Sequence, residues 1–176
     1  PYAVSVNVTD GAMPVGGGTV EVRQLSDGAI CTINLATSSS CQLTSNSALT
    51  TAVRASFLGG AGYAPSSSAV TPHLVNRGDT EIVITDDSPD PSGVAQPISV
   101  SVRVTAVAPA AGTPTGNVLI TDGIASCGMT LPTASCTLVP KALGAATLEA
   151  RYLGDANFNA SVDTEAHTVS VDGADL

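Results

Sequence analysis

The sequence has little charge, a single lysine and no long apolar run. Only 12% of its 176 residues are charged, and Lys141 is the one lysine. Soluble proteins usually carry about 25% charged residues. The net charge of −9 argues against a protein that binds nucleic acid or inserts at an anionic membrane surface, because both need a basic face. No stretch of about 18 apolar residues occurs, so no membrane span is predicted in this segment.

What is present favours short strands. Hydrophobic residues make up 43% of the chain, mostly Val, Ala, Leu and Ile, beside many Ser, Thr and Gly. A disordered chain would be poorer in β-branched residues. This composition predicts strands that are joined by turns rich in Gly, Pro, Ser and Thr.

The four cysteines form two close pairs, Cys31 with Cys41 and Cys127 with Cys136. No CxxC motif occurs, and the two histidines lie far from the cysteines in sequence, which argues against a zinc site. Two disulfides are the favoured interpretation. They indicate an oxidising compartment, so we expect an extracellular or cell-surface location.

An internal repeat of about 95 residues organises the chain. Residues 1–9 (PYAVSVNVT) match residues 97–105 (PISVSVRVT), and the cysteine pairs and histidines repeat at nearly the same offset. The second repeat has a lead-in, residues 80–96, with no counterpart in the first. We therefore expect a fragment, or a mature product without its leader, whose first repeat lacks its N-terminal strand.

Period-two alternation predicts seven strands in the second repeat. They are residues 80–85, 97–105, 117–121, 125–130, 135–139, 146–152 and 162–171. The first repeat shows the same inward faces, for example at Val20 and Val22. The predicted fold class is all-β: two tandem immunoglobulin-like sandwiches of about seven strands each, the first without its N-terminal strand. An open jelly roll is the alternative. The expected domains are 1–76 and 77–176, the second with a linker and a C-terminal tail.

Several motifs of the second repeat resemble one known family. They are TEIVITDDSPDPSGVAQPISVSVRVT, GTPTGNVLITDG, SCGMTLPTASCTL and ATLEARYLGDANFNAS. Together they look like the bacterial Ig-like domain repeats of large secreted and surface proteins. The resemblance covers residues 80–172 and, more weakly, the first repeat from its second strand onward. It implies tandem, mostly non-catalytic modules of adhesin-like extracellular proteins.

The predicted strands also suggest how the cysteines pair. A hairpin around residues 131–133 places Cys127 opposite Cys136, and a similar turn near Ala36 places Cys31 opposite Cys41. Each disulfide is then expected within one hairpin and not between sheets. Closing so short a loop stabilises the fold by roughly 3 kcal/mol.

Acidic residues cluster in a turn-rich segment at Asp86, Asp87 and Asp90, which we interpret as a solvated loop. The acids expected to face the junction between the repeats are Asp27, Asp79, Glu81 and Asp155. Asp79, Glu81 and Asp155 are weak calcium candidates, because Ca²⁺ takes carboxylate oxygens from flexible loops. Repeat 1 has Gly60 where repeat 2 has Asp155, so no shared metal site is predicted.

Arg77, Gly78 and Asp79 form an RGD tripeptide between the repeats. Such a triplet binds integrins when it lies on an exposed tight loop, and this makes it a weak binding candidate. The competing interpretation is a plain turn in which Gly78 supplies an unusual backbone conformation.

Catalysis and sugar stacking have little support. His167 has Asp163 and Glu165 near it in sequence, but no nucleophile motif such as GxSxG occurs. Four of the five aromatic residues pair between the repeats, which is typical of core positions. Tyr63 and Phe158 are expected to plug one end of each sandwich. We therefore predict no enzymatic activity and no cofactor.

The predicted function is a non-catalytic structural or scaffold repeat of an extracellular bacterial surface protein or fibre, such as an adhesin stalk. Neighbouring Ig-like repeats are the expected partners. A first repeat without its first strand exposes an edge, so a homopolymer formed by β-strand complementation is one version of this hypothesis. The alternatives are a loop-mediated receptor or glycan binding module and an accessory domain of a secreted enzyme.

Overall fold

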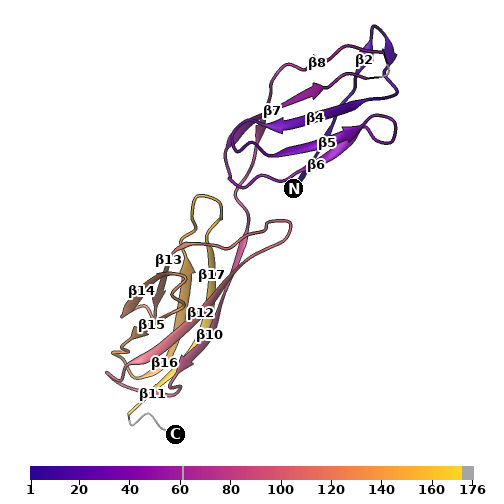
Figure 1. The fold of residues 1–176 in the computed structure, drawn as a ribbon. Coiled ribbons are helices and arrows are strands. Elements are labelled where there is room, and N and C mark those ends of the chain that lie inside the picture. Colours follow the sequence, from indigo (N-terminus) through magenta and orange to yellow (C-terminus); the bar gives the residue numbers. More distant parts are fainter. Residues whose placement is uncertain (61, 172–176) are drawn as a thin grey trace. The chain divides into compact units, whose positions relative to one another are not determined.

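The chain forms two compact units, Pro1–Asn76 (unit 1) and Arg77–Leu176 (unit 2). The computed structural model describes residues 1–60 and 62–171 (Figure 1). Across these residues every regular element is a strand or a turn, and no helix is long and apolar enough to cross a membrane. Most of the predicted C-terminal tail, residues 172–176, lies outside the described part of the chain.

Unit 2 is a sandwich of two sheets. The smaller sheet has the order β10 (Thr80–Ser88), β12 (Ile98–Ala106) and β15 (Ser135–Leu138). The larger has the order β11 (Ser92–Gly93), β17 (Ser161–Ser170), β16 (Gly144–Tyr152), β13 (Gly116–Thr121) and β14 (Ser126–Leu131). All pairs are antiparallel except β11 with β17. The chain therefore changes sheets between β10 and β11.

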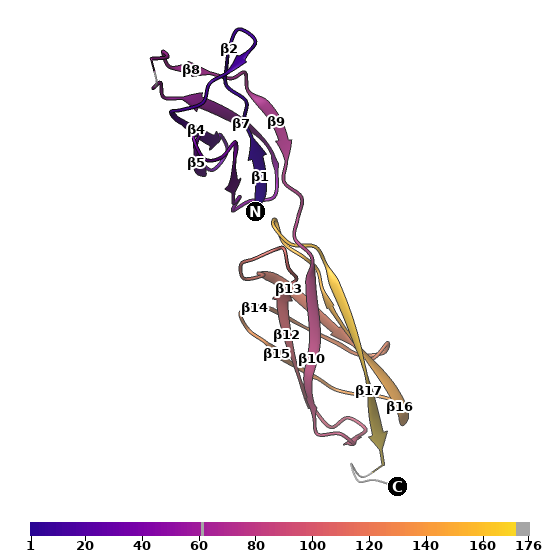
Figure 2. The same ribbon diagram turned by 90° about the vertical axis from the view of Figure 1, so that its right-hand side faces the viewer.

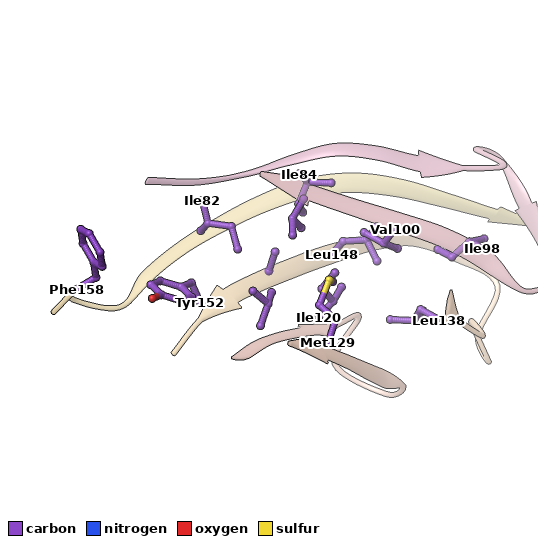
Figure 3. Close-up of a cluster of buried hydrophobic side chains, with 13 residues drawn as sticks. Ile82, Ile84, Ile98, Val100, Ile120, Met129, Leu138, Leu148, Tyr152 and Phe158 are labelled. Carbon is purple, nitrogen blue, oxygen red and sulfur yellow. The ribbon is translucent and has the colours of Figure 1, made fainter. Parts of the chain in front are cut away.

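Period-two alternation builds the core of unit 2. On β12, Ile98, Val100 and Val102 are at most 3% exposed, whereas Ser99 and Arg103 face solvent. Figure 3 shows side chains of both sheets converging between the ribbons. The core includes Ile82, Ile84, Ile98, Val100, Val102, Val118, Ile120, Met129, Leu138, Leu148, Ala150, Tyr152 and Phe158. Burying each large side chain contributes about 1.5–3 kcal/mol before the entropy cost of folding.

Unit 1 repeats this plan with fewer paired residues. One sheet consists of β1 (Tyr2–Ser5) and β6 (Ser40–Leu43). The other has the order β5 (Ile30–Asn34), β4 (Thr19–Gln24), β7 (Thr50–Phe57) and β8 (Ser66–Ser67), and β9 (Thr71–Leu74) also pairs with β7. A short ribbon, β2 (Thr9–Asp10) with β3 (Met13–Pro14), follows β1. The core is Val15, Val20, Val22, Ile33, Leu43, Val53 and Phe57.

The internal repeat relates several strands of unit 1 to strands of unit 2. By the offset of residues 1–9 against 97–105, β1 corresponds to β12, and β6 corresponds to β15. Within the described residues, unit 1 has no counterpart of β10, and β1 pairs with β6 alone. The all-β immunoglobulin-like sandwich prediction is confirmed.

The hairpin predicted around residues 131–133 is wrong. β14 pairs with β13, and β15 pairs with β12, so the two strands lie in different sheets. In unit 1, β5 and β6 are separated in the same way. The reason is that alternation fixes which face of a strand is buried but does not fix its pairing partner. The segment between β14 and β15 crosses from one sheet to the other.

Candidate functional site

The disulfides join the two sheets of each unit. Cys31 on β5 is bonded to Cys41 on β6, and Cys127 on β14 is bonded to Cys136 on β15, with Cα atoms 6.0 Å apart in both cases. The cysteines pair as predicted, but the expectation that each bridge lies within one hairpin is wrong. Each bridge ties one edge of a sandwich covalently, and all four half-buried cysteines pack against the cores.

A buried polar cluster lies at the other edge of unit 2, between β10 and β17. The side chain of His167 on β17 is fully buried. Its Nδ1 lies 2.8 Å from Asp87 Oδ2 and 3.3 Å from Asp90 Oδ1, and its Nε2 lies 2.8 Å from Ser92 Oγ. The Thr168 N–H also donates to Asp90 Oδ1 at 2.9 Å. We call Asp87, Asp90, Ser92 and His167 the edge cluster.

The partners of His167 differ from those that the sequence suggested. Asp163 instead accepts a hydrogen bond from the Ile84 N–H at 2.8 Å. Asp87, expected in a solvated loop, has a side chain only 13% exposed because it pairs with His167. The sequence did carry one signal that His167 is buried. On β17 it lies two residues before Val169, so both side chains lie on the same, buried face of the strand. Nothing in the local sequence identified Ser92.

The edge cluster has the hydrogen-bond order of a Ser-His-Asp hydrolase triad. A nucleophile must reach its substrate, however, and Ser92 is 0% exposed within the short strand β11. The cluster's contacts instead hold the segment that crosses from β10 to β11 against β17. Its role in this geometry is therefore to satisfy buried polar groups.

Glu165 lies beside this cluster, two residues before His167 on β17. Its Oε2 atom is buried and has no hydrogen-bond partner among the described residues. Burial raises the pKa of Glu165, and the negative charges of Asp87, Asp163, Asp90 and Asp86 raise it further. Asp87, Asp90 and His167 offer ligand atoms within 4.8 Å of one another and could hold a cation. Both nitrogens of His167, however, already have protein partners.

The three calcium candidates do not come together. Asp155 accepts hydrogen bonds from the backbone and side chain of Thr115 and from the Asn157 and Phe158 N–H groups, at 2.6–2.9 Å. Burial acts to raise its pKa, but these hydrogen bonds outweigh it and lower the pKa of Asp155 to about 2. Asp79 Oδ1 accepts from Asn159 Nδ2 at 2.9 Å, and Glu81 is exposed on β10. Asp155 therefore closes its loop through these hydrogen bonds.

The RGD tripeptide lies in extended, hydrogen-bonded backbone. Gly78 forms a parallel bridge with Phe158, donates to Asn157 O at 2.8 Å and accepts from the Asn159 N–H at 2.8 Å. A Cβ atom at position 78 would lie 2.5 Å from the Ala110 Cβ. Gly78 is therefore needed for close packing. Neither the tight loop nor the left-handed turn considered from the sequence is present.

The two predicted aromatic plugs behave differently. Phe158 is 6% exposed and belongs to the core, whereas Tyr63 is 40% exposed, so the prediction for Tyr63 is wrong. The physical reason lies in the preceding loop. Asp155 binds the backbone of residues 157 and 158 and directs the Phe158 ring inward. Gly60 stands at the matching position in unit 1 and has no side chain that could do this.

A groove of about 420 Å³ runs beside β1 in unit 1. Its lining includes Val4 and Val6 on one side and Thr71, Pro72 and His73 on the other. Val4 and Val6 are only half-buried, while their counterparts Val100 and Val102 are 0% and 3% exposed. The difference arises because β10 covers that edge in unit 2 and no described strand covers it in unit 1.

Comparison with known proteins agrees with this architecture. The family model described as bacterial Ig-like domain (group 3) matches residues 84–172, which is half of the chain and nearly all of unit 2. No curated protein matches the chain. Domains of this kind are generally non-catalytic, in keeping with the inaccessible Ser92. The chain belongs to the bacterial Ig-like domain family, group 3.

Proposed function

We propose that the two units are structural spacers of an extracellular bacterial surface protein, of the kind that forms an adhesin stalk. The observation that carries this proposal is the disulfide between the two sheets of each unit. Each unit has its own core, so each is expected to resist unfolding as an independent element.

The oxidised cysteines support an extracellular location. Disulfides persist in secreted and surface proteins and are rare in reducing cytosol. All four cysteines of the chain are used in the two bonds. The low charge and the scarcity of exposed aromatic side chains fit a spacer better than a ligand-binding face.

Single-molecule force spectroscopy on the whole chain, held between marker domains, tests the proposal. We expect two unfolding events per molecule. Each disulfide locks a segment with a cysteine separation of 10 or 9 residues. A reducing agent should therefore lengthen each event by about 24–30 Å, the extended length of that segment less the 6.0 Å that already separates its two Cα atoms. The variant Cys127→Ser/Cys136→Ser is the matched control, because it should lengthen only the event of unit 2.

Two results contradict the proposal. One is an oxidised unit that extends without a force peak. The other is saturable binding of a receptor or glycan that is lost when the exposed loop residues 107–109 and 111–113 are replaced by glycine and serine, with both force peaks intact. That second result would favour a binding module.

A further inference from the structure

The edge cluster of unit 2 gathers negative charge around a single basic atom. The carboxylates of Asp87 and Asp90 lie 2.8 and 3.3 Å from His167 Nδ1. Glu165 on β17 experiences the negative charge of both and of two further acids. Among the described residues no lysine or arginine forms an ion pair with any of these acids. A carboxylate as buried as that of Asp87, 13% exposed, is usually paired with a cation or bound to a metal ion.

The ring of His167 is held so that Nδ1 faces the two carboxylates. The side chain is 0% exposed, and Nε2 on the other side of the ring lies 2.8 Å from Ser92 Oγ. In the tautomer in which Nε2–H donates to Ser92, Nδ1 presents a lone pair to Asp87 and Asp90. Metal-binding histidines are commonly oriented by such a partner on the second ring nitrogen. The position between Nδ1 and the carboxylates therefore suits one cation, a proton or a metal ion.

The spacing of the ligand atoms fits one small metal ion. One ligand atom from each of Asp87, Asp90 and His167 lies within 4.8 Å of the other two. Ligands bound at about 2.0–2.2 Å to a tetrahedral zinc ion are about 3.3–3.6 Å apart, so the distances from Nδ1 would change by less than about 1 Å. The side chain of Asp90 is 39% exposed, which gives an ion a way in from solvent.

Glu165 supplies an independent indication. Its Oε2 atom is buried and has no hydrogen-bond partner among the described residues. Such an atom is unusual, because nearly all buried polar atoms in native structures have a partner. Glu165 lies two residues before His167, so both side chains lie on the same face of β17. A cation at the edge cluster would balance the charge of this carboxylate as well.

We infer that the edge cluster binds one divalent transition-metal ion of the Zn²⁺ class. The ligands are His167 Nδ1 and the carboxylates of Asp87 and Asp90, with Glu165 as a further carboxylate partner. An imidazole nitrogen favours Zn²⁺ and similar ions, whereas Ca²⁺ takes oxygen ligands. The ion takes the place of a proton on Nδ1, which is released to solvent. This inference goes beyond the spacer proposal and does not depend on it.

Titration of the EDTA-treated whole chain with ZnCl₂ tests the inference, with calorimetry and ¹⁵N-resolved NMR as readouts. We expect one ion per chain, with saturable shifts at His167 and Thr168 and none at His73. The melting temperature of unit 2 should rise by at least about 5 °C at saturating Zn²⁺, and that of unit 1 should not change. CaCl₂ at the same concentration should produce neither effect.

Four variants locate the ion. Asp90→Asn and Glu165→Gln should each weaken Zn²⁺ binding at least about tenfold, because each removes a charged partner of the ion. The amide oxygen of the first variant can still accept from the Thr168 N–H, so this backbone contact is kept. Asp86→Asn is the matched control: it removes the same charge from an exposed acid of β10 and should change the affinity by less than about threefold. His73→Ala should leave Zn²⁺ binding unaltered.

Three outcomes overturn the inference. The first is the absence of saturable shifts at His167 up to about 1 mM Zn²⁺. The second is an equal loss of affinity in Asp86→Asn and Asp90→Asn, which would indicate diffuse attraction to an acidic edge. The third is a set of Zn²⁺ shifts that His73→Ala abolishes or that CaCl₂ reproduces. The two force peaks expected of the spacer are measured on the metal-free chain, so the inference and the spacer proposal can fail separately.

Discussion

Tyr2 and His73 stack with their ring centroids 4.0 Å apart, although they lie on strands of different sheets. The strands β1 and β9 that carry them are seen beside each other in Figure 2. The Tyr2 hydroxyl also donates to Gln24 Oε1 at 2.6 Å. This aromatic contact connects the sheets of unit 1 on the side where the edge cluster connects those of unit 2. The same histidine position thus serves two different contacts.

Removing the disulfide of unit 2 should lower its stability substantially. We expect Cys127→Ser/Cys136→Ser to cost about 2–4 kcal/mol and to lower the melting temperature of that unit by roughly 10 °C or more. Calorimetry of the whole chain measures this change. The transition of unit 1, which keeps Cys31–Cys41, is the internal control, and an equal shift of both transitions would contradict the prediction.

His167→Ala should destabilise unit 2 far more than His73→Ala destabilises unit 1. The first change leaves Asp87 and Ser92 without their buried partner and opens a cavity, at a cost of about 2–4 kcal/mol. The second removes a half-exposed ring, at a cost of about 1 kcal/mol or less. Urea unfolding of both variants measures the difference. Similar losses would show that the edge cluster is not a major support of unit 2.

Asp155→Asn should remove a pH-dependent part of the stability. The folded pKa of Asp155, about 2, lies below the ordinary value of 3.8. The carboxylate therefore stabilises the fold fully above pH 4–5, and this contribution is lost as the pH falls toward 2. Allowing for solvent screening, we expect the variant to lose about 1–2 kcal/mol at pH 7 and little at pH 2. Thermal melts across this range test it, with Asp79→Asn as control.

Glu165→Gln should have the opposite effect on stability. Because burial and neighbouring acids raise the pKa of Glu165, ionisation costs more in the folded than in the unfolded chain. The wild-type protein then loses stability as the pH rises through and above the ordinary pKa of 4.5. The variant should melt higher at pH 7–8 and equal the wild type below pH 4. A variant that is less stable at pH 7 would indicate that the carboxylate has an ionic partner.

Gly78→Ala tests the close packing of the RGD segment. The new methyl group would lie 2.5 Å from the Ala110 Cβ, and such overpacking typically costs about 1–3 kcal/mol. Gly128→Ala is a matched control in the same unit, since its Cβ would meet only the Val118 carbonyl oxygen at an ordinary 3.6 Å. Equal stability of the two variants, measured in urea, would contradict the packing argument.

The sequence predicted the fold well because strand faces follow from alternation. The buried set on β12, Ile98, Val100 and Val102, can be read directly from the residues. The pairing partners of a strand cannot be read in this way. The alternation of residues 126–138, for example, is compatible both with a hairpin and with a segment that crosses from one sheet to the other. The edge cluster was missed for a related reason: Asp87 and Ser92 are far from His167 in sequence, and only the crossing segment after β10 brings them together.

The disulfide between β14 and β15 determines on which side the two sheets of unit 2 can separate. Those strands form one side of the sandwich, and β10 with β17 forms the other (Figure 2). When the sheets separate transiently, the disulfide keeps its side closed, so water and denaturant enter between β10 and β17. The amides of β10 should therefore exchange with solvent sooner than those of β15, and reduction should make the two sides alike.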